Sequence, residues 1–259
     1  MKKNLLVVFV LLVGVLFFGS QAMAVPVQFI ETGMENITIY DGRKDFSGNS
    51  WYNSENEDNE VEPGMINTQA WDLEAMYYSN SNNMLGMSGG WDFINGVSGY
   101  SYTSGDIFID VDGDAVYGVD GGPNDKGYDY VFDVDWNNGT WDIYSIDDGT
   151  LLDVAEPKNL SESNPWAFDV NNGVTALDSG QFNHYVNSGI YFVDGFDMTT
   201  ILNSDIYTGT FLAHFTMECG NDNLIGQTAA PVPEPASMLL LGTGLIMFGS
   251  VSRKKFFKK

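Results

Sequence analysis

The chain has 259 residues, of which 44% are hydrophobic and 14% aromatic, and its formal net charge at pH 7 is −24. Most of its Lys and Arg lie near the two ends, so residues 25–228 hold four cations against thirty-four acids, a formal charge near −30. This charge excludes nucleic acid as a partner, because phosphate binding requires cations, and it disfavours anionic membrane surfaces. The many aromatic residues argue for a folded domain and against a disordered acidic chain.

Residues 1–24 have the three parts of a secretory signal peptide. Two lysines follow Met1, residues 5–18 are apolar, and Ala22 and Ala24 are the small residues that a signal peptidase reads. We therefore expect export, with cleavage by signal peptidase before Val25. An uncleaved N-terminal anchor is the alternative.

Residues 25–228 alternate segments rich in Val, Ile, Tyr, Phe and Trp with clusters of Gly, Asn and Asp, which is typical of strands joined by turns. We find no internal repeat and little helical periodicity. The expected strands are residues 27–30, 37–40, 70–78, 84–91, 106–111, 128–135, 140–145, 166–170, 189–196 and 210–217. The pattern predicts an all-β fold, a single antiparallel β-sandwich or jelly-roll-like domain.

The strongest alternation lies in residues 128–136, and it is followed by an Asn-Gly pair at Asn138 and Gly139. This pair is a hairpin signal, so residues 140–145 should return antiparallel. The residues expected to face the core are Tyr128, Tyr130, Phe132, Val134 and Trp136, and those expected on the other face are Asp129, Asp133 and Asp135.

The best helix candidate is residues 197–204, with Asp197 as its N-cap, and a loop is the alternative for this short segment. Residues 53–63 and 118–127 combine acids, amides and glycines, which indicates solvated loops.

Asp110, Asp112 and Asp114 stand at alternate positions at the end of an expected strand. Ca²⁺ takes six to eight oxygen ligands, so these three are candidate calcium ligands, and Ca²⁺ is the one cofactor that the sequence suggests. An EF-hand is excluded, because Ala115 and Gly121 occupy the positions of its glycine and bidentate glutamate. The alternative is that the aspartates only shape a turn. A calcium site other than an EF-hand stays open, with Asp120, Asp125 or Asp129 supplying further ligands.

No arrangement of catalytic residues stands out, and we expect no enzymatic activity. His184 and His214 are the only histidines and have no partner at metal-binding spacing, so one surface and one strand-packed histidine are expected. Cys219 is the single cysteine; no cation nearby in the sequence would lower its pKa, and we expect a small buried residue. Acid pairs suited to glycoside hydrolysis are too numerous to single out one. The tryptophans are expected mainly in the core, with Trp51 as the most exposed and a candidate to stack on sugar rings.

The last segment, residues 229–259, joins three features. A Pro233-Glu234-Pro235 unit comes first, and residues 236–251 form an uncharged apolar run. The basic tail consists of Arg253, Lys254, Lys255, Lys258 and Lys259. As a helix the run would measure about 24 Å, somewhat short of the ~30 Å hydrocarbon core. Cations are kept on the cytoplasmic side, so the chain before the run should lie outside the cytoplasm. An ordinary membrane anchor or a terminal core helix is the alternative.

This tail resembles the PEP-CTERM sorting signal of bacterial exosortase substrates, from Val232 through Ser237 to the basic end. The resemblance implies that exosortase recognises the tail and cuts near Pro233-Glu234-Pro235, and that the cargo reaches the cell surface or extracellular polysaccharide. Residues 105–112 (Gly-Asp-Ile-Phe-Ile-Asp) and 214–226 (His…Thr-Met-Glu-Cys-Gly-Asn-Asp) resemble stretches of a subset of PEP-CTERM surface proteins. Residues 219–222 are expected to end the final strand in a turn.

We therefore expect a signal peptide (1–24), an acidic all-β surface domain (25–228) and a sorting segment (229–259). The predicted function is that of an exported cell-surface or extracellular-matrix protein with a structural or adhesive role in surface polysaccharide or biofilm. A calcium-dependent carbohydrate-binding module is the alternative, and a secreted glycan-active enzyme is a third class. Expected partners are signal peptidase, exosortase, the membrane through the C-terminal segment before processing, and extracellular polysaccharide.

Overall fold

The computed structural model describes residues 33–39, 66, 68–115, 122–123, 127–147, 150–155, 163–169 and 174–228. The signal peptide, the expected strand at 27–30, Trp51, the loop at 53–63 and the sorting segment lie outside these residues. The chain divides into two compact units, Met1–Thr228 and Ala229–Lys259, and the description below concerns the first. Within the described part, no helix is long and apolar enough to span a membrane.

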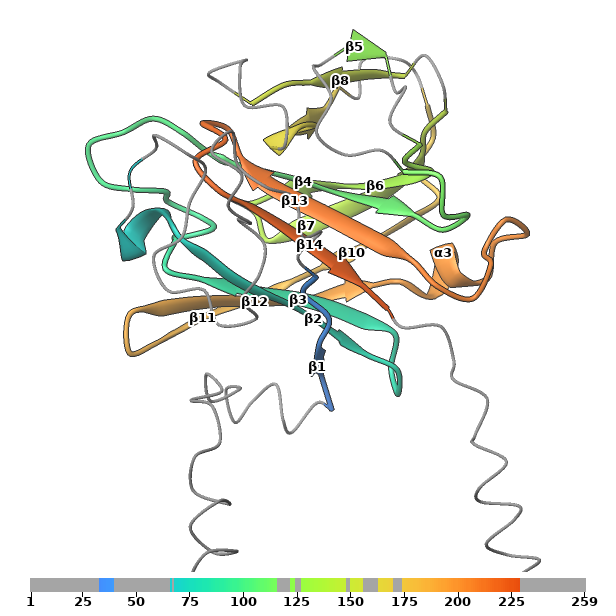
Figure 1. Cartoon of the computed structure of the whole chain (residues 1–259), viewed down its shortest axis with the longest axis horizontal. Coiled ribbons are helices and arrows are strands. Elements are labelled where there is room, and N and C mark those ends of the chain that lie inside the picture. Colours follow the sequence, from blue (N-terminus) through green and yellow to red (C-terminus); the bar gives the residue numbers. More distant parts are fainter. Residues whose placement is uncertain are drawn as a thin grey trace, which may run out of the picture. The chain divides into compact units, whose positions relative to one another are not determined.

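Two large antiparallel sheets face each other and form a β-sandwich (Figure 1). The first sheet has the order β1 (Glu35–Asn36), β2 (Leu73–Ser79), β3 (Met84–Gly89), β12 (Ile190–Asp197) and β11 (Asn183–Asn187). The second has the order β10 (Asp178–Gln181), β7 (Thr140–Ser145), β6 (Tyr130–Asp135), β4 (Ser104–Asp110), β13 (Leu212–Met217) and β14 (Asn223–Gln227). The predicted all-β sandwich is confirmed.

A third, smaller sheet covers part of the outer face of the second sheet, and the sequence did not predict it. It contains β5 (Gly122–Pro123), β8 (Leu151–Asp153) and β9 (Ala167–Phe168), and it lies over β4 and β6 in Figure 1. Phe108, Val131 and Tyr144 of the second sheet pack with Leu152 and Phe168 of the third. The central strands of the second sheet are therefore buried on both faces, whereas its edge strand β10 stays largely exposed.

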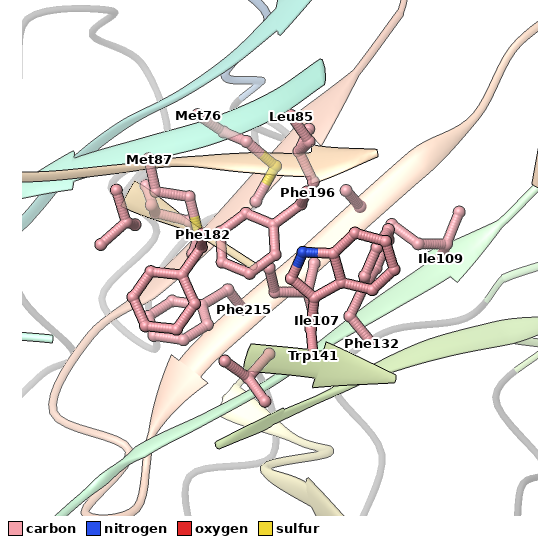
Figure 2. Close-up of a cluster of buried hydrophobic side chains, with 14 of the residues drawn as sticks. Met76, Leu85, Met87, Ile107, Ile109, Phe132, Trp141, Phe182, Phe196 and Phe215 are labelled. Atoms are coloured by element: carbon pink, nitrogen blue, oxygen red, sulfur yellow. The ribbon is translucent and has the colours of Figure 1, made fainter. Parts of the chain in front are cut away.

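The main core lies between the two large sheets. Side chains of β2, β3 and β12 meet those of β4, β6 and β13, and Phe182 and Trp141 also lie in this core (Figure 2). Alternation decides the side that each residue takes: Ile107 and Ile109 point into this core, whereas Phe108 between them points to the third sheet. Each fully buried side chain of this size stabilises the fold by roughly 1.5–3 kcal/mol.

The predicted hairpin is confirmed, with Asp135 paired to Thr140. Its turn has four residues, 136–139, and Gly139 at its end has φ +70°. The Asp135 carboxylate accepts the backbone N–H groups of Asn137 (3.1 Å) and Asn138 (3.0 Å). The predicted core face is right for Tyr130, Phe132, Val134 and Trp136. It is wrong for Tyr128, which precedes the regular strand and packs against Phe108 in the outer cluster.

One continuous segment passes from one large sheet to the other at each edge of the sandwich. On one side β10 of the second sheet runs through Phe182 into β11 of the first. On the other, Ile37 donates its N–H to Met76 of β2, and Ile39 donates its N–H to Ile225 of β14. Thr38 also forms a bridge with Gly226.

The remaining elements agree in part with the predictions. A short helix is confirmed, but α3 covers only Thr199–Leu202, and its N-cap is Met198 and not Asp197 as predicted. The Asp197 carboxylate still accepts the N–H of Thr199 at 2.9 Å, because Asp197 ends β12 just before the helix. A 3₁₀ turn, η1 (Gln69–Trp71), occupies the start of the strand expected at 70–78. The turn at 219–222 does not end the last strand, because β14 follows it. The sequence missed β1, β5, β8, β10, β11 and β14, and of the strand expected at 37–40 the described residues form only the bridge at Thr38.

Candidate functional site

Three aspartates meet at the end of β4 and form a candidate metal centre. One carboxylate oxygen from each of Asp110, Asp112 and Asp129 lies within 4.8 Å of the other two. Asp110 is buried, with 3% of its surface exposed, while Asp129 is half-buried and Asp112 is exposed. The pairing of β4 with β6 brings Asp129 to this place, because its backbone N–H donates to the carbonyl of Ile109.

Backbone N–H groups hold two of these carboxylates in position. Asp110 accepts the N–H groups of Asp112 (3.1 Å) and Gly113 (2.8 Å) on one oxygen and that of Ala115 (3.1 Å) on the other. Asp129 accepts the N–H of Val111 at 2.8 Å. Asp110 therefore shapes a turn, as the alternative interpretation of this motif proposed, and its carboxylate also contributes to the cluster.

Burial is the main cause that raises the pKa of Asp129 above its ordinary value. The negative charges of Asp112, Asp110 and Asp114 raise it further, and the N–H of Val111 opposes the shift. A divalent cation would reverse this repulsion, because each carboxylate favours the ionised form beside a positive charge. Three carboxylates supply only part of the six to eight oxygens that Ca²⁺ takes, so carbonyl oxygens or water would have to complete the shell.

Of the three predicted ligands, the structure brings Asp110 and Asp112 together and adds Asp129. Asp114 is not a member of this group; it lies against Gly127, where an added Cβ would stand 2.8 Å from the Asp114 carbonyl oxygen. Asp120 and Asp125 lie outside the described residues.

A buried carboxyl at the other end of β4 holds two sheets together. Asp106 accepts the N–H of Val134 in β6 at 2.9 Å and that of Phe168 in β9 at 2.8 Å. Burial, followed by the charge of Asp133, raises the pKa of Asp106 to about 8. Gly105 beside it leaves room for Trp166, whose indole Cδ1 would lie 2.6 Å from an added Cβ. Gly105 and Asp106 of the stretch at 105–112 therefore have structural contacts.

In the stretch at 214–226, the turn residues Asn221 and Asp222 also make contacts that stabilise the fold. Asp222 accepts the N–H of Leu73 at 2.7 Å and that of Asn223 at 2.8 Å. Asn221 accepts the N–H of Ile66 at 3.1 Å and donates its amide to the Ile66 carbonyl at 3.1 Å. The turn between β13 and β14 thus binds the chain that leads into β2.

The cysteine and the histidines take the positions expected of them. Cys219 is buried in the main core, and burial raises the pKa of its thiol to about 11. His214 is fully buried on β13, where its ring stacks on Tyr128 with centroids 5.9 Å apart. His184 lies half-buried on β11 and stacks on Tyr191.

The expectation that tryptophans fill the core is confirmed for four of them. Trp71, Trp91, Trp136 and Trp141 are buried. The sequence interpretation missed an aromatic group beside Trp71, formed by the exposed Tyr100 and the half-buried Tyr102. The available signal was the Tyr-Ser-Tyr alternation directly after a Ser-Gly pair.

Comparison with known proteins identifies a motif near the C-terminus. No curated protein and no solved structure matches the chain. Residues 231–255 match the family model for the PEP-CTERM protein-sorting motif. The chain therefore carries the sorting motif of exosortase substrates, which implies export to the cell surface with a transient C-terminal membrane anchor.

Proposed function

We propose that this protein has a structural or adhesive role in surface polysaccharide or biofilm and is not an enzyme. One observation carries the proposal: the sorting motif follows directly on a strongly acidic β-sandwich. The last strand, β14, ends at Gln227, and the motif begins at residue 231. The cargo that exosortase would release is thus the sandwich itself.

The distribution of charge supports an extracellular role. Residues 25–228 hold a formal charge near −30, and cleavage near Pro233 would remove the five cations of the tail. The released domain would repel polyanions and attract divalent cations and neutral or cationic polymers. A domain of this kind suits a hydrated matrix of neutral polysaccharide.

The surroundings of Cys219, the potential nucleophile, and of the two histidines, the potential bases, support a non-enzymatic role. A thiol with a pKa of about 11 stays protonated at neutral pH, and Cys219 is buried in the core. The two histidines belong to different sheets, His184 to the first and His214 to the second.

Fractionation of the native cell envelope tests the proposal. The wild-type protein should leave the membrane and enter the surface or matrix fraction, and a strain without it should form a weaker biofilm. The Pro233→Ala, Pro235→Ala double variant should stay in the membrane with its tail attached. Mass spectrometry of the mature protein should find a C-terminus near Pro233; a C-terminus at Lys259 contradicts the processing step, and an unchanged biofilm contradicts the role.

A calcium-dependent carbohydrate-binding module is the second candidate, and the meeting of Asp110, Asp112 and Asp129 supports it. Calcium should raise the thermal midpoint of the purified full chain, and chelator should lower it. Identical midpoints would remove the calcium part of this candidate. A secreted glycan-active enzyme is the third class, and turnover of a surface polysaccharide by the purified protein would be required to support it.

A further inference from the structure

An exposed aromatic group lies where the loop between β3 and β4 meets η1. Trp71 of η1 and Trp91 at the start of the loop are buried, and their ring centroids are 5.5 Å apart. Tyr100 and Tyr102 lie later in the same loop, where Tyr100 is exposed and Tyr102 is half-buried against the main core. Tyr100 exposes 53% of its surface, the largest exposed fraction among the large hydrophobic side chains of the described residues.

The two tyrosine rings rest on a buried indole. The ring of Tyr100 meets Trp71 edge-on, with centroids 4.9 Å apart and planes at 86°. Tyr102 meets Trp71 at 6.2 Å and 68°. The planes of the two tyrosines differ by only 20°, and their centroids are 6.3 Å apart. Edge-to-face contacts of this kind are favourable and fix the orientation of both rings.

The loop that presents these rings is held by hydrogen bonds at its start. Asp92 accepts the N–H groups of Ile94 (3.0 Å) and Asn95 (3.1 Å) on one oxygen and the Asn95 amide (2.9 Å) on the other. Gly96 has φ +61°, and a Cβ there would lie 2.7 Å from the Tyr102 carbonyl oxygen.

The far end of the loop is fixed in the same way. The indole N–H of Trp91 donates to the Ser104 hydroxyl at 2.8 Å, and this hydroxyl donates to the Phe93 carbonyl at 2.7 Å. Glu218 accepts the N–H of Thr103 at 3.0 Å. The rings are thus in place before any ligand arrives, which lowers the entropic cost of binding.

We propose that Tyr100 and Tyr102 form a binding surface for a neutral polysaccharide chain. The face of an aromatic ring is electronegative and attracts the C–H groups that line one face of a sugar ring. The formal charge near −30 disfavours polyanionic chains at the same place. The two carboxylates nearest in the sequence already have partners: Asp106 is buried and accepts two backbone N–H groups, and Asp92 accepts three N–H groups of its own loop. Ser98, Ser101 and Asn95 of the loop offer polar groups to sugar hydroxyls.

This inference rests on the proposed function, because it gives the surface protein its contact with the matrix. It does not require calcium, since Asp110, Asp112 and Asp129 stand at the end of β4, whereas the loop leads into its start.

Calorimetry on the purified full chain in detergent tests the surface. The probes are neutral hexasaccharides with β-1,4-glucan, β-1,3-glucan and N-acetylglucosamine backbones, together with an anionic hexauronate. We expect at least one neutral probe to bind and the hexauronate not to bind. Tyr100→Ala should weaken binding about tenfold, since the loss of one aromatic contact has this order of effect. Tyr100→Phe, which keeps the ring, should bind within about twofold of the wild type.

Leu177→Ala is the matched control, because Leu177 is exposed to a similar extent (51%) and contributes no aromatic ring. It should bind like the wild type, and all variants should melt with the wild type. Absence of binding by every neutral probe, or equal binding by Tyr100→Ala, would overturn the inference. The envelope fractionation would still report on the surface role, because it depends on the sorting tail and not on Tyr100.

Discussion

At the start of β4 the Asp106 carboxyl links two layers of the protein, whereas at its end the Asp110 carboxylate turns back onto its own loop. Asp106 accepts N–H groups from β6 and β9, which belong to different sheets. Asp110 accepts N–H groups from residues two, three and five places further along the chain. The same residue type on the same strand thus stabilises the fold at one end and gathers negative charge at the other.

The largest expected effect is the loss of the link at the start of β4. Asp106→Ala leaves the N–H groups of Val134 and Phe168 without their acceptor, and it should lower the free energy of unfolding by about 3 kcal/mol. Urea titration of the purified full chain measures this. Asp205→Ala, which removes an exposed carboxylate, should change it by less than about 0.5 kcal/mol. Equal midpoints for Asp106→Ala and the wild type would show that Asp106 does not join the layers.

Two glycine substitutions test how tightly the chain is packed at the two ends of β4. Gly105→Ala places a Cβ 2.6 Å from Trp166 and 2.7 Å from the Thr216 carbonyl oxygen, and it should cost about 2 kcal/mol of stability. Gly113→Ala meets no atom within 4 Å but must keep φ +92°, and it should cost about 1 kcal/mol. Urea midpoints of the two variants give the order. A larger loss of stability for Gly113→Ala than for Gly105→Ala would contradict the tight packing at the start of β4.

The pH dependence of stability should reflect the buried carboxyls beside the third sheet. The pKa of Asp106 is about 8, and burial with the facing Asp142 raises the pKa of Asp133 to about 6. Both exceed the ordinary value of 3.8, so the folded protein keeps protons that the unfolded chain releases. Stability should therefore fall as pH rises from about 4 to about 8 and level off above that.

Thermal melting measures this pH effect. The midpoint at pH 8 should lie about 5 °C below that at pH 5. Asp133→Asn should remove the part of the decline due to Asp133, between about pH 4 and 6. It should also make the part due to Asp106 smaller without abolishing it, because burial is the main cause of the raised pKa of Asp106 and the charge of Asp133 the second. A midpoint that rises between pH 5 and 8 would contradict the raised pKa values.

The smallest expected effect concerns calcium at the end of β4. Millimolar Ca²⁺ should raise the thermal midpoint by about 2 °C. Asp129→Asn should abolish this rise, because it removes one of the three grouped carboxylates. Asp114→Asn should preserve it, because Asp114 is not in the group. Equal responses of both variants would show that general screening of charge, and not a site, causes the rise.

The part of the fold that the sequence predicts well is the hairpin of β6 and β7. The alternation in β6 and the Asn-Gly pair after it indicate the hairpin and its faces, because only one side of each strand meets the main core. The edge strands β10 and β11 were missed, since the first is Asp-Ser-Gly-Gln and both are largely exposed. These two segments become strands because they pair with β7 and β12, and not because their own residues favour a strand.

The sequence predicted the part of the acidic site whose residues are close neighbours in the chain. The positions of Asp110 and Asp112 at a strand end indicated their proximity, but the choice of Asp129 over Asp114 depends on the register between β4 and β6. That register is a long-range property. The last strand was missed for a related reason, because the Asn-Asp-Asn run before it is typical of a turn.

The pairing of residues 37–39 with β14 has a consequence for the order of export and folding. This contact joins segments almost two hundred residues apart, and such non-local pairing slows folding because a long loop must close first. A chain that emerges from its N-terminus cannot complete this edge until Gln227 has crossed the membrane, only a few residues before the sorting motif arrives. The residues that complete this edge and the sorting motif therefore follow each other closely in the order of export.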